Sequence, residues 1–269
     1  MMLLALLSPA FALVAREPCM GFYAAESIPG PGATDVPVDV IPTFIFYDQG
    51  CATTMAVDLE LYRYDDTDAN LIGSSSETLV GSGPLVLSLD LLEAIGPLEP
   101  LTNYVVRTVP VDGVMDATAI GFTTGEGTLA GLSGEPQLRM VNADANKDEG
   151  VWTLSGEVLV DPASDPDGLS ILTIPHPDED RLLAASVITG SGLFTEFISF
   201  TVEDVPDELC LQVEQFDGAQ RSSGLSESDC LEVDKHRSLR GGCSTSAAAA
   251  GLGPTLLAML LAALGRRSR

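Results

Sequence analysis

The residues that could do acid–base chemistry gather around His176, which stands between two prolines and is followed by Asp178, Glu179 and Asp180. A histidine held by a carboxylate can act as a general base in hydrolysis. The sequence has no G-x-S-x-G nucleophile turn and no H-E-x-x-H metal helix. The second histidine, His236, lies next to the C-terminal segment. We therefore expect His176 to lie in a surface loop, with a surface hydrolase using His176 as an alternative function.

A second candidate for chemistry is an acidic stretch in which Asp144, Asn146 and Asp148 place oxygen ligands at alternate positions. A calcium loop has this spacing, but it also needs a glycine at its sixth position and a carboxylate at its twelfth. This stretch has Glu149 and Ser155 there. We interpret it first as a solvated loop, which leaves calcium as the one cofactor to consider and no residue assigned to a metal. The chain has two further acidic stretches of this kind, residues 65–70 and 161–168.

The cysteines near the C-terminal end predict a disulfide. Around Cys210 and Cys230 apolar and polar residues alternate, which is typical of strands with one buried face, and both cysteines lie on the polar side. A turn over residues 217–224 brings the two sulfurs opposite each other. Closing this loop contributes about 3 kcal/mol in the chain-entropy model.

The remaining cysteines are Cys19, Cys51 and Cys243. If Cys243 belongs to the C-terminal segment, four cysteines remain, and an exported chain usually pairs an even number. Four cysteines allow three connectivities, of which we favour the local ones, Cys19–Cys51 and Cys210–Cys230. Lipid attachment at Cys19 is the competing interpretation.

Composition excludes one class of function. The chain has 269 residues, 45% of them hydrophobic, and a formal net charge of −26. That size and apolar content suffice for the cores of one or two domains. Binding to nucleic acid depends on cations that neutralise phosphates, so this charge argues against a nucleic-acid partner. The negative charge has two further interpretations: it keeps the protein soluble, or it allows divalent cations to bridge the protein to other acidic surfaces.

Both ends of the chain carry export features. Residues 1–15 form an apolar run with an Ala10-Phe11-Ala12 cleavage pattern, typical of a signal peptide although no cation precedes Arg16. Residues 237–269 contain Cys243, then an uncharged stretch from Ala247 to Leu264 and terminal arginines. Eighteen helical residues reach about 27 Å, a marginal membrane span. The arginines keep this end cytoplasmic and the rest of the chain outside.

The order of cysteine, short hydrophobic helix and basic tail resembles the myxobacterial C-terminal sorting signal. The resemblance implies that Cys243 is the point of processing or lipid attachment and that the protein is displayed on the outer-membrane surface. An ordinary stop-transfer anchor is the alternative. Both interpretations predict an exported, membrane-anchored protein of the cell envelope.

Between the ends the sequence predicts an all-β fold with two antiparallel β-sandwich domains, residues 16–127 and 135–236, joined by a linker over 128–134. Glycine and proline are frequent, and short apolar or alternating runs recur between turn residues. We expect only one helical turn, over 89–95. The expected strands of the first domain cover residues 35–46, 55–64, 71–73, 77–80, 85–90, 103–109 and 119–124. In the second domain Trp152, Leu154, Val158 and Val160 share one face, as do the apolar residues of 198–202. We expect the Cys210–Cys230 hairpin to supply the last two strands.

The first domain resembles a bacterial immunoglobulin-like domain of surface-layer type. The likeness rests on Pro-Gly-Ala-Thr-Asp-Val-Pro-Val at 31–38, on Pro-Leu-Glu-Pro-Leu-Thr-Asn-Tyr-Val-Val at 97–106 and on Phe-Thr-Thr-Gly at 122–125. Residues 211–219 resemble the closing hairpin of fibronectin type III-like domains. These resemblances imply structural or adhesive modules without catalytic residues.

Taken together, these features predict a surface-anchored protein with a structural or adhesive role that is not an enzyme. The membrane is its expected partner through the C-terminal segment, with other surface proteins or polysaccharide as further partners. A calcium-dependent adhesin is the second alternative, beside the hydrolase.

Overall fold

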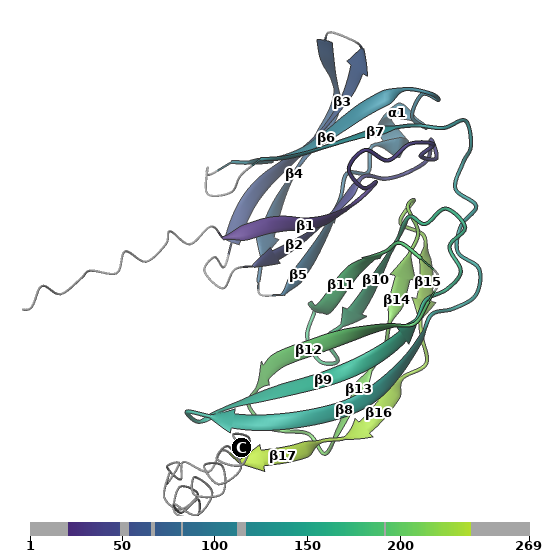
Figure 1. The fold of residues 1–269 in the computed structure, drawn as a ribbon. Helices are drawn as coiled ribbons and strands as arrows, with labels where there is room; N and C mark the ends of the chain where they lie inside the picture. Colours follow the sequence, from purple (N-terminus) through teal and green to yellow (C-terminus); the bar gives the residue numbers. More distant parts are fainter. Residues whose placement is uncertain are drawn as a thin grey trace, which may run out of the picture.

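The computed structural model describes residues 21–48, 54–65, 68–81, 83–111, 117–190 and 192–237, and most of them lie in β-strands (Figure 1). The predicted all-β class is confirmed. The helical turn expected over 89–95 is present as α1 (Leu92–Ile95), which ends at Gly96 with a positive φ of 74°. No helix in the described part of the chain is long and apolar enough to cross a membrane. The predicted signal peptide and C-terminal helix lie outside the described residues.

The described residues between 21 and 124, here called the N-terminal assembly, form two antiparallel sheets. One sheet has the order β1-β2-β5 and the other the order β4-β3-β6-β7. The strands are β1 (Phe22–Ile28), β2 (Thr43–Asp48), β3 (Thr54–Asp65), β4 (Asp68–Val80), β5 (Pro84–Ser88), β6 (Asn103–Pro110) and β7 (Thr118–Thr123).

The two sheets share one hydrophobic core. Phe44 and Phe46 from β2 and Leu59 and Leu61 from β3 are fully buried in one core cluster. Burying a side chain of this size contributes about 1.5–3 kcal/mol. At the start of β6, the Tyr104 hydroxyl accepts a hydrogen bond from the Glu99 amide at 2.9 Å. A tyrosine at this place, bonded to backbone a few residues upstream, is the tyrosine corner of Greek-key sandwiches.

Several strand predictions for this assembly need correction. Residues 71–73 and 77–80 belong to the single strand β4, because the β3–β4 hairpin pairs without a break except for one irregularity. Residues 35–42 are not a strand. Pro37 and Pro42 have no amide to donate, and only Val36 forms a bridge there, to Thr124. Strand β1 was not predicted, because a bulge at residues 24–26 breaks its alternation.

The described residues between 133 and 237, here called the C-terminal assembly, also enclose a single core. Two four-stranded sheets have the orders β12-β9-β8-β17 and β11-β10-β14-β15, and β13 pairs with β16 alone. The strands are β8 (Gln137–Asp148), β9 (Val151–Asp161), β10 (Ser170–Pro175), β11 (Leu182–Ile188), β12 (Phe194–Val202), β13 (Glu208–Leu211), β14 (Glu214–Phe216), β15 (Ser222–Leu225), β16 (Asp229–Glu232) and β17 (Asp234–Arg237).

The apolar faces predicted for this assembly are confirmed: Leu154, Val158, Ile198 and Phe200 are buried, and Trp152 packs against the same core. The Cys210–Cys230 hairpin is not the last element, however. Strand β17 follows it and pairs with β8 in parallel, so the C-terminal assembly is not purely antiparallel.

Candidate functional site

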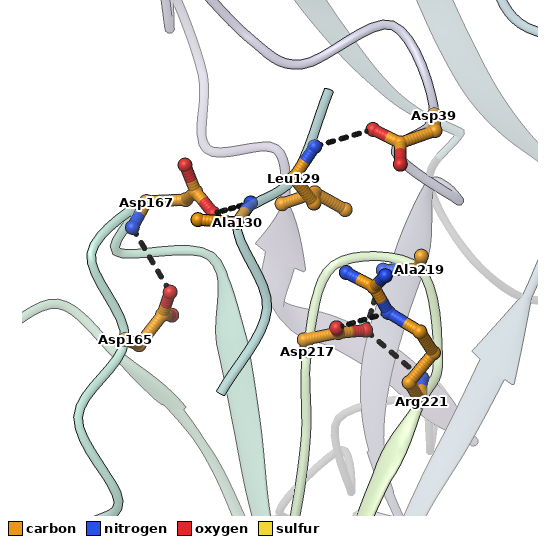
Figure 2. A network of polar contacts seen from close by, with 8 residues as sticks. All are labelled: Asp39, Leu129, Ala130, Asp165, Asp167, Asp217, Ala219 and Arg221. Atoms are coloured by element: carbon orange, nitrogen blue, oxygen red, sulfur yellow. Dashed lines mark hydrogen bonds and ion pairs between the residues drawn. The ribbon is translucent and has the colours of Figure 1, made fainter. Parts of the chain in front are cut away.

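A network of polar contacts lies where the chain passes from one assembly to the other (Figure 2). The beginning of the expected linker over 128–134 is held by the N-terminal assembly. The Leu129 amide donates to a carboxylate oxygen of Asp39 at 2.7 Å, and the Val38 amide donates to the Gly127 carbonyl at 2.9 Å. The Leu129 side chain is only 6% exposed. The linker is therefore part of the packed structure.

The C-terminal assembly holds the next residue of the same segment. The Ala130 amide donates to Asp167 at 2.8 Å (Figure 2). Asp165 in turn accepts hydrogen bonds from the amides of Asp167, at 3.1 Å, and Leu169, at 2.7 Å. Two successive linker amides are thus bound by carboxylates from opposite sides of the junction.

Asp217 is the most buried carboxylate of this network, with 1% of the residue exposed. It accepts hydrogen bonds from the amides of Ala219 and Arg221, both at 2.9 Å, and from Nε of Arg221 at 2.6 Å (Figure 2). A buried carboxylate needs such partners to offset its loss of hydration. The guanidinium also lies against Gly131, where a Cβ would come within 3.3 Å of a guanidinium nitrogen. Glycine at this position lets the linker pass close to the ion pair.

The loop that Asp217 stabilises also contacts the N-terminal assembly. The Ile41 amide donates to the Gly218 carbonyl at 2.7 Å, and Nε2 of Gln220 donates to the Thr43 hydroxyl at 2.9 Å. Asp217 therefore fixes the shape of a loop whose next residues bridge the two assemblies.

A second seam runs along β11. The Tyr47 hydroxyl donates to the Ala185 carbonyl at 2.8 Å, and the Val187 amide donates to Glu26 at 2.5 Å. Burial, followed by the nearby carboxylates of Glu26 and Glu196, raises the pKa of Tyr47, which keeps this hydroxyl a donor. These side chains satisfy backbone groups at the edge of β11, as edge strands require.

Apolar contacts also join the two assemblies. Ile171 and Ala185, from β10 and β11, are buried in the core cluster of the N-terminal assembly, each with at most 1% of its surface exposed. A junction with a shared core, a docked linker and carboxylates that hold backbone amides can fix the orientation of two modules.

The predicted disulfide is present. Cys210 and Cys230 are directly paired in the β13–β16 ladder, bonded to each other, with their Cα atoms 4.0 Å apart. The neighbouring Leu209 and Leu211 are buried, as the alternation predicts. The two ends of the hairpin belong to different sheets: β13 and β16 pair with each other, whereas β14 and β15 join the sheet of β10 and β11. Cys19, Cys51 and Cys243 lie outside the described residues.

The loop predicted around Asp144 is wrong. Asp144, Asn146 and Asp148 lie on strand β8, where side chains two residues apart are about 6.8 Å from each other on one face. They cannot wrap around one cation as the side chains of a loop do. Asp144 contacts Nε2 of His236 on β17 at 3.1 Å. Among the residues that the structure describes, no three His, Cys, Asp or Glu side chains are grouped to hold a metal ion.

Of the other acidic stretches, residues 161–168 include a turn, as we expected. They contain Asp165 and Asp167 of the junction, whose carboxylates accept backbone amides. In the stretch over residues 65–70, β3 ends at Asp65 and β4 begins at Asp68, and the two residues between them lie outside the described residues.

His176 is buried, with 7% of the residue exposed, so the prediction of a surface loop histidine is wrong. Nδ1 accepts hydrogen bonds from the amides of Asp178 and Glu179, both at 3.1 Å. The ring packs edge-on against Phe200, with 4.7 Å between ring centroids. Burial lowers the pKa of His176, and the charge of Arg181 lowers it further.

These contacts determine which nitrogen of the His176 ring carries the proton. Because Nδ1 accepts two amides, the proton of the neutral ring is on Nε2, which lies 3.6 Å from a carboxylate oxygen of Glu179. No hydroxyl or thiol is among the hydrogen-bond partners of His176 in the described residues. The arrangement fixes the 176–181 loop.

The residues of the junction were missed by the sequence reasoning. Asp165 and Asp217 precede turn residues, a pattern that does predict carboxylates bonded to nearby amides. Nothing in the sequence indicates that Asp39 and Asp167 hold successive linker amides.

Comparisons with known proteins give little further information. No family model matches the chain, and no curated protein matches it. Among solved structures, the chain is similar to the fibronectin(III)-like modules of Clostridium thermocellum CbhA, with 14% identity and a TM-score of 0.25. The match covers 80% of this chain and 94% of that one.

Proposed function

We propose that the protein is a rigid structural or adhesive spacer of two tandem immunoglobulin-like or fibronectin type III-like sandwiches, displayed on the cell envelope without catalytic activity. The observation that carries this proposal is the junction. Linker amides, a shared core and the Tyr47 and Glu26 contacts hold two modules in one orientation. A spacer needs a fixed orientation, whereas a flexible tether would need a free linker.

Further support comes from the strand order. The N-terminal assembly has a three-stranded and a four-stranded sheet, with a tyrosine corner at the start of β6, as Greek-key sandwiches have. The sequence features of export, residues 1–15 and 237–269 with Cys243, support display outside the cell with the membrane as a partner. Polysaccharide or other surface proteins are the partners an adhesive role would use.

Residual dipolar couplings test the rigidity. We expect the amides of the described residues between 22 and 123 and between 137 and 237 to fit one alignment tensor. In the variant Asp39→Ala/Tyr47→Phe, which removes one contact from each seam, the two assemblies should align to different degrees. If the unmodified protein already needs two tensors of unequal magnitude, it is not a rigid spacer.

The location has a separate test. Protease treatment of intact cells should remove the protein, and the mass of the envelope-associated chain should identify its end. A lipid-bearing chain that ends near Cys243 supports processing there, whereas a chain that retains the terminal arginines supports a stop-transfer anchor. A chain found only in the cytoplasm would contradict the proposal.

A further inference from the structure

A groove of about 350 Å³ lies at one end of the C-terminal assembly, between β13 and the loop that follows β10. Its floor is apolar: Leu154, Phe200 and Leu209 line it and are almost fully buried. This volume is at the lower end of ligand pockets and suits one or two side chains of a peptide.

The groove exists because prolines end a sheet ladder. Strand β14 pairs with β10 as far as Thr173↔Glu214. Beyond this point the partner segment contains Pro175 and Pro177, which have no amide to donate. Residues 208–211, which precede β14 in the chain, do not pair with β10 and form β13, which pairs with β16. His176 holds the loop that follows β10 through the amides of Asp178 and Glu179.

The edge of β13 opposite to β16 has no strand partner among the described residues. Cys210 and Cys230 lie opposite each other with their Cα atoms 4.0 Å apart, the spacing of a non-hydrogen-bonded pair. The amides and carbonyls of Cys210, and of Glu208 two residues before it, therefore point away from β16. Both residues line the groove. Such an edge can accept an extended peptide as an additional strand.

The charge at the groove selects the peptide. Asp178, Asp204 and Glu208 line it, are exposed, and have no cationic partner among the described residues. Nearby carboxylates differ: Asp207 pairs with Lys235 at 2.9 Å, and Glu179 pairs with Arg181 at 2.6 Å. Opposite charge raises the rate of encounter and selects the partner.

We propose that this groove binds an extended segment of another protein in which apolar residues alternate with Lys or Arg, added as a strand to the edge of β13. The apolar side chains lie on the floor formed by Phe200 and Leu209. The basic side chains lie near Asp178, Asp204 and Glu208. This inference does not depend on where the chain is anchored or on the rigidity of the junction.

The test uses the full chain and two synthetic peptides, Lys-Val-Lys-Val-Lys and Glu-Val-Glu-Val-Glu, both with blocked ends. At low salt the basic peptide should bind, and the acidic peptide should bind at least about tenfold more weakly. Hydrogen exchange should slow at the Glu208 and Cys210 amides when the basic peptide is added. N-methylation of the peptide amides that face β13 should abolish binding, and methylation of the alternate amides should not.

A matched pair of variants separates the groove from net charge. Asp178→Asn/Asp204→Asn/Glu208→Gln should weaken binding of the basic peptide about tenfold or more. Glu93→Gln/Glu126→Gln/Glu135→Gln removes the same charge from exposed sites elsewhere and should leave binding within about twofold. Equal losses in both variants, equal binding of both peptides, no binding, or unchanged exchange at Glu208 and Cys210 would each overturn the proposal. Self-association through β13 in sedimentation would also overturn it.

Discussion

Replacing Asp217 tests the physical account of the junction most directly. In Asp217→Ala the amides of Ala219 and Arg221 lose their acceptor, and Nε of Arg221 loses its partner. An unsatisfied donor away from water costs about 1–3 kcal/mol. The ion pair itself contributes about 1 kcal/mol or less, because the Arg221 side chain is 53% exposed. We therefore expect a loss of about 3–4 kcal/mol in the free energy of unfolding.

Two matched variants make this prediction specific. Asp217→Asn retains an oxygen for the two amides, and Arg221→Gln removes only the exposed cation, so each should cost about 1 kcal/mol. Urea unfolding followed by the fluorescence of Trp152, the single tryptophan, measures all three free energies. The amide signals of Ile41 and Leu129 should shift in NMR spectra of Asp217→Ala, because Gly218 of the 217–221 loop contacts both residues. The reasoning is refuted if Asp217→Ala costs no more than Arg221→Gln.

Three further predictions concern other parts of the fold. The variant Cys210→Ser/Cys230→Ser should lose about 3 kcal/mol in urea unfolding, and reduction of the parent protein should give the same loss; an unchanged midpoint in both would contradict the account. Folding lowers the pKa of His176 from 6.5. Its contribution to the free energy of unfolding should therefore be fully present above pH 6.5 and should decrease as the pH falls toward the lower folded-state pKa. His176→Gln should flatten this pH dependence, and identical pH profiles of the two proteins would argue against it. Tyr104→Phe leaves the Glu99 amide without its acceptor and should cost about 1–2 kcal/mol in thermal unfolding, whereas the control Tyr64→Phe, at an exposed side chain, should change stability by less than about 0.5 kcal/mol; equal effects would show that the Tyr104 hydroxyl does not hold the corner.

Much of the local structure could be predicted from the sequence. The alternation around residues 209–213 and 231–233 placed Cys210 and Cys230 on one face, and the turn over 217–224 fixed their register, as the direct pairing confirms. The class of fold followed in the same way from short alternating runs between turn residues. These features are local, because side chains two residues apart on a strand share a face wherever the strand lies.

Tertiary structure decided which polar groups meet. Asp39 and Leu129 are 90 residues apart in the chain, and Ala130 and Asp167 are 37 apart, so no local pattern indicates their hydrogen bonds. His176 has polar neighbours in sequence, yet it is buried because Phe200 and the backbone of its own loop enclose it. Alternation and turn residues involve only near neighbours along the chain, so they can be recognised in the sequence. Burial, the docking of the linker and the edge of β13 depend on where distant segments return, which only the packed molecule determines.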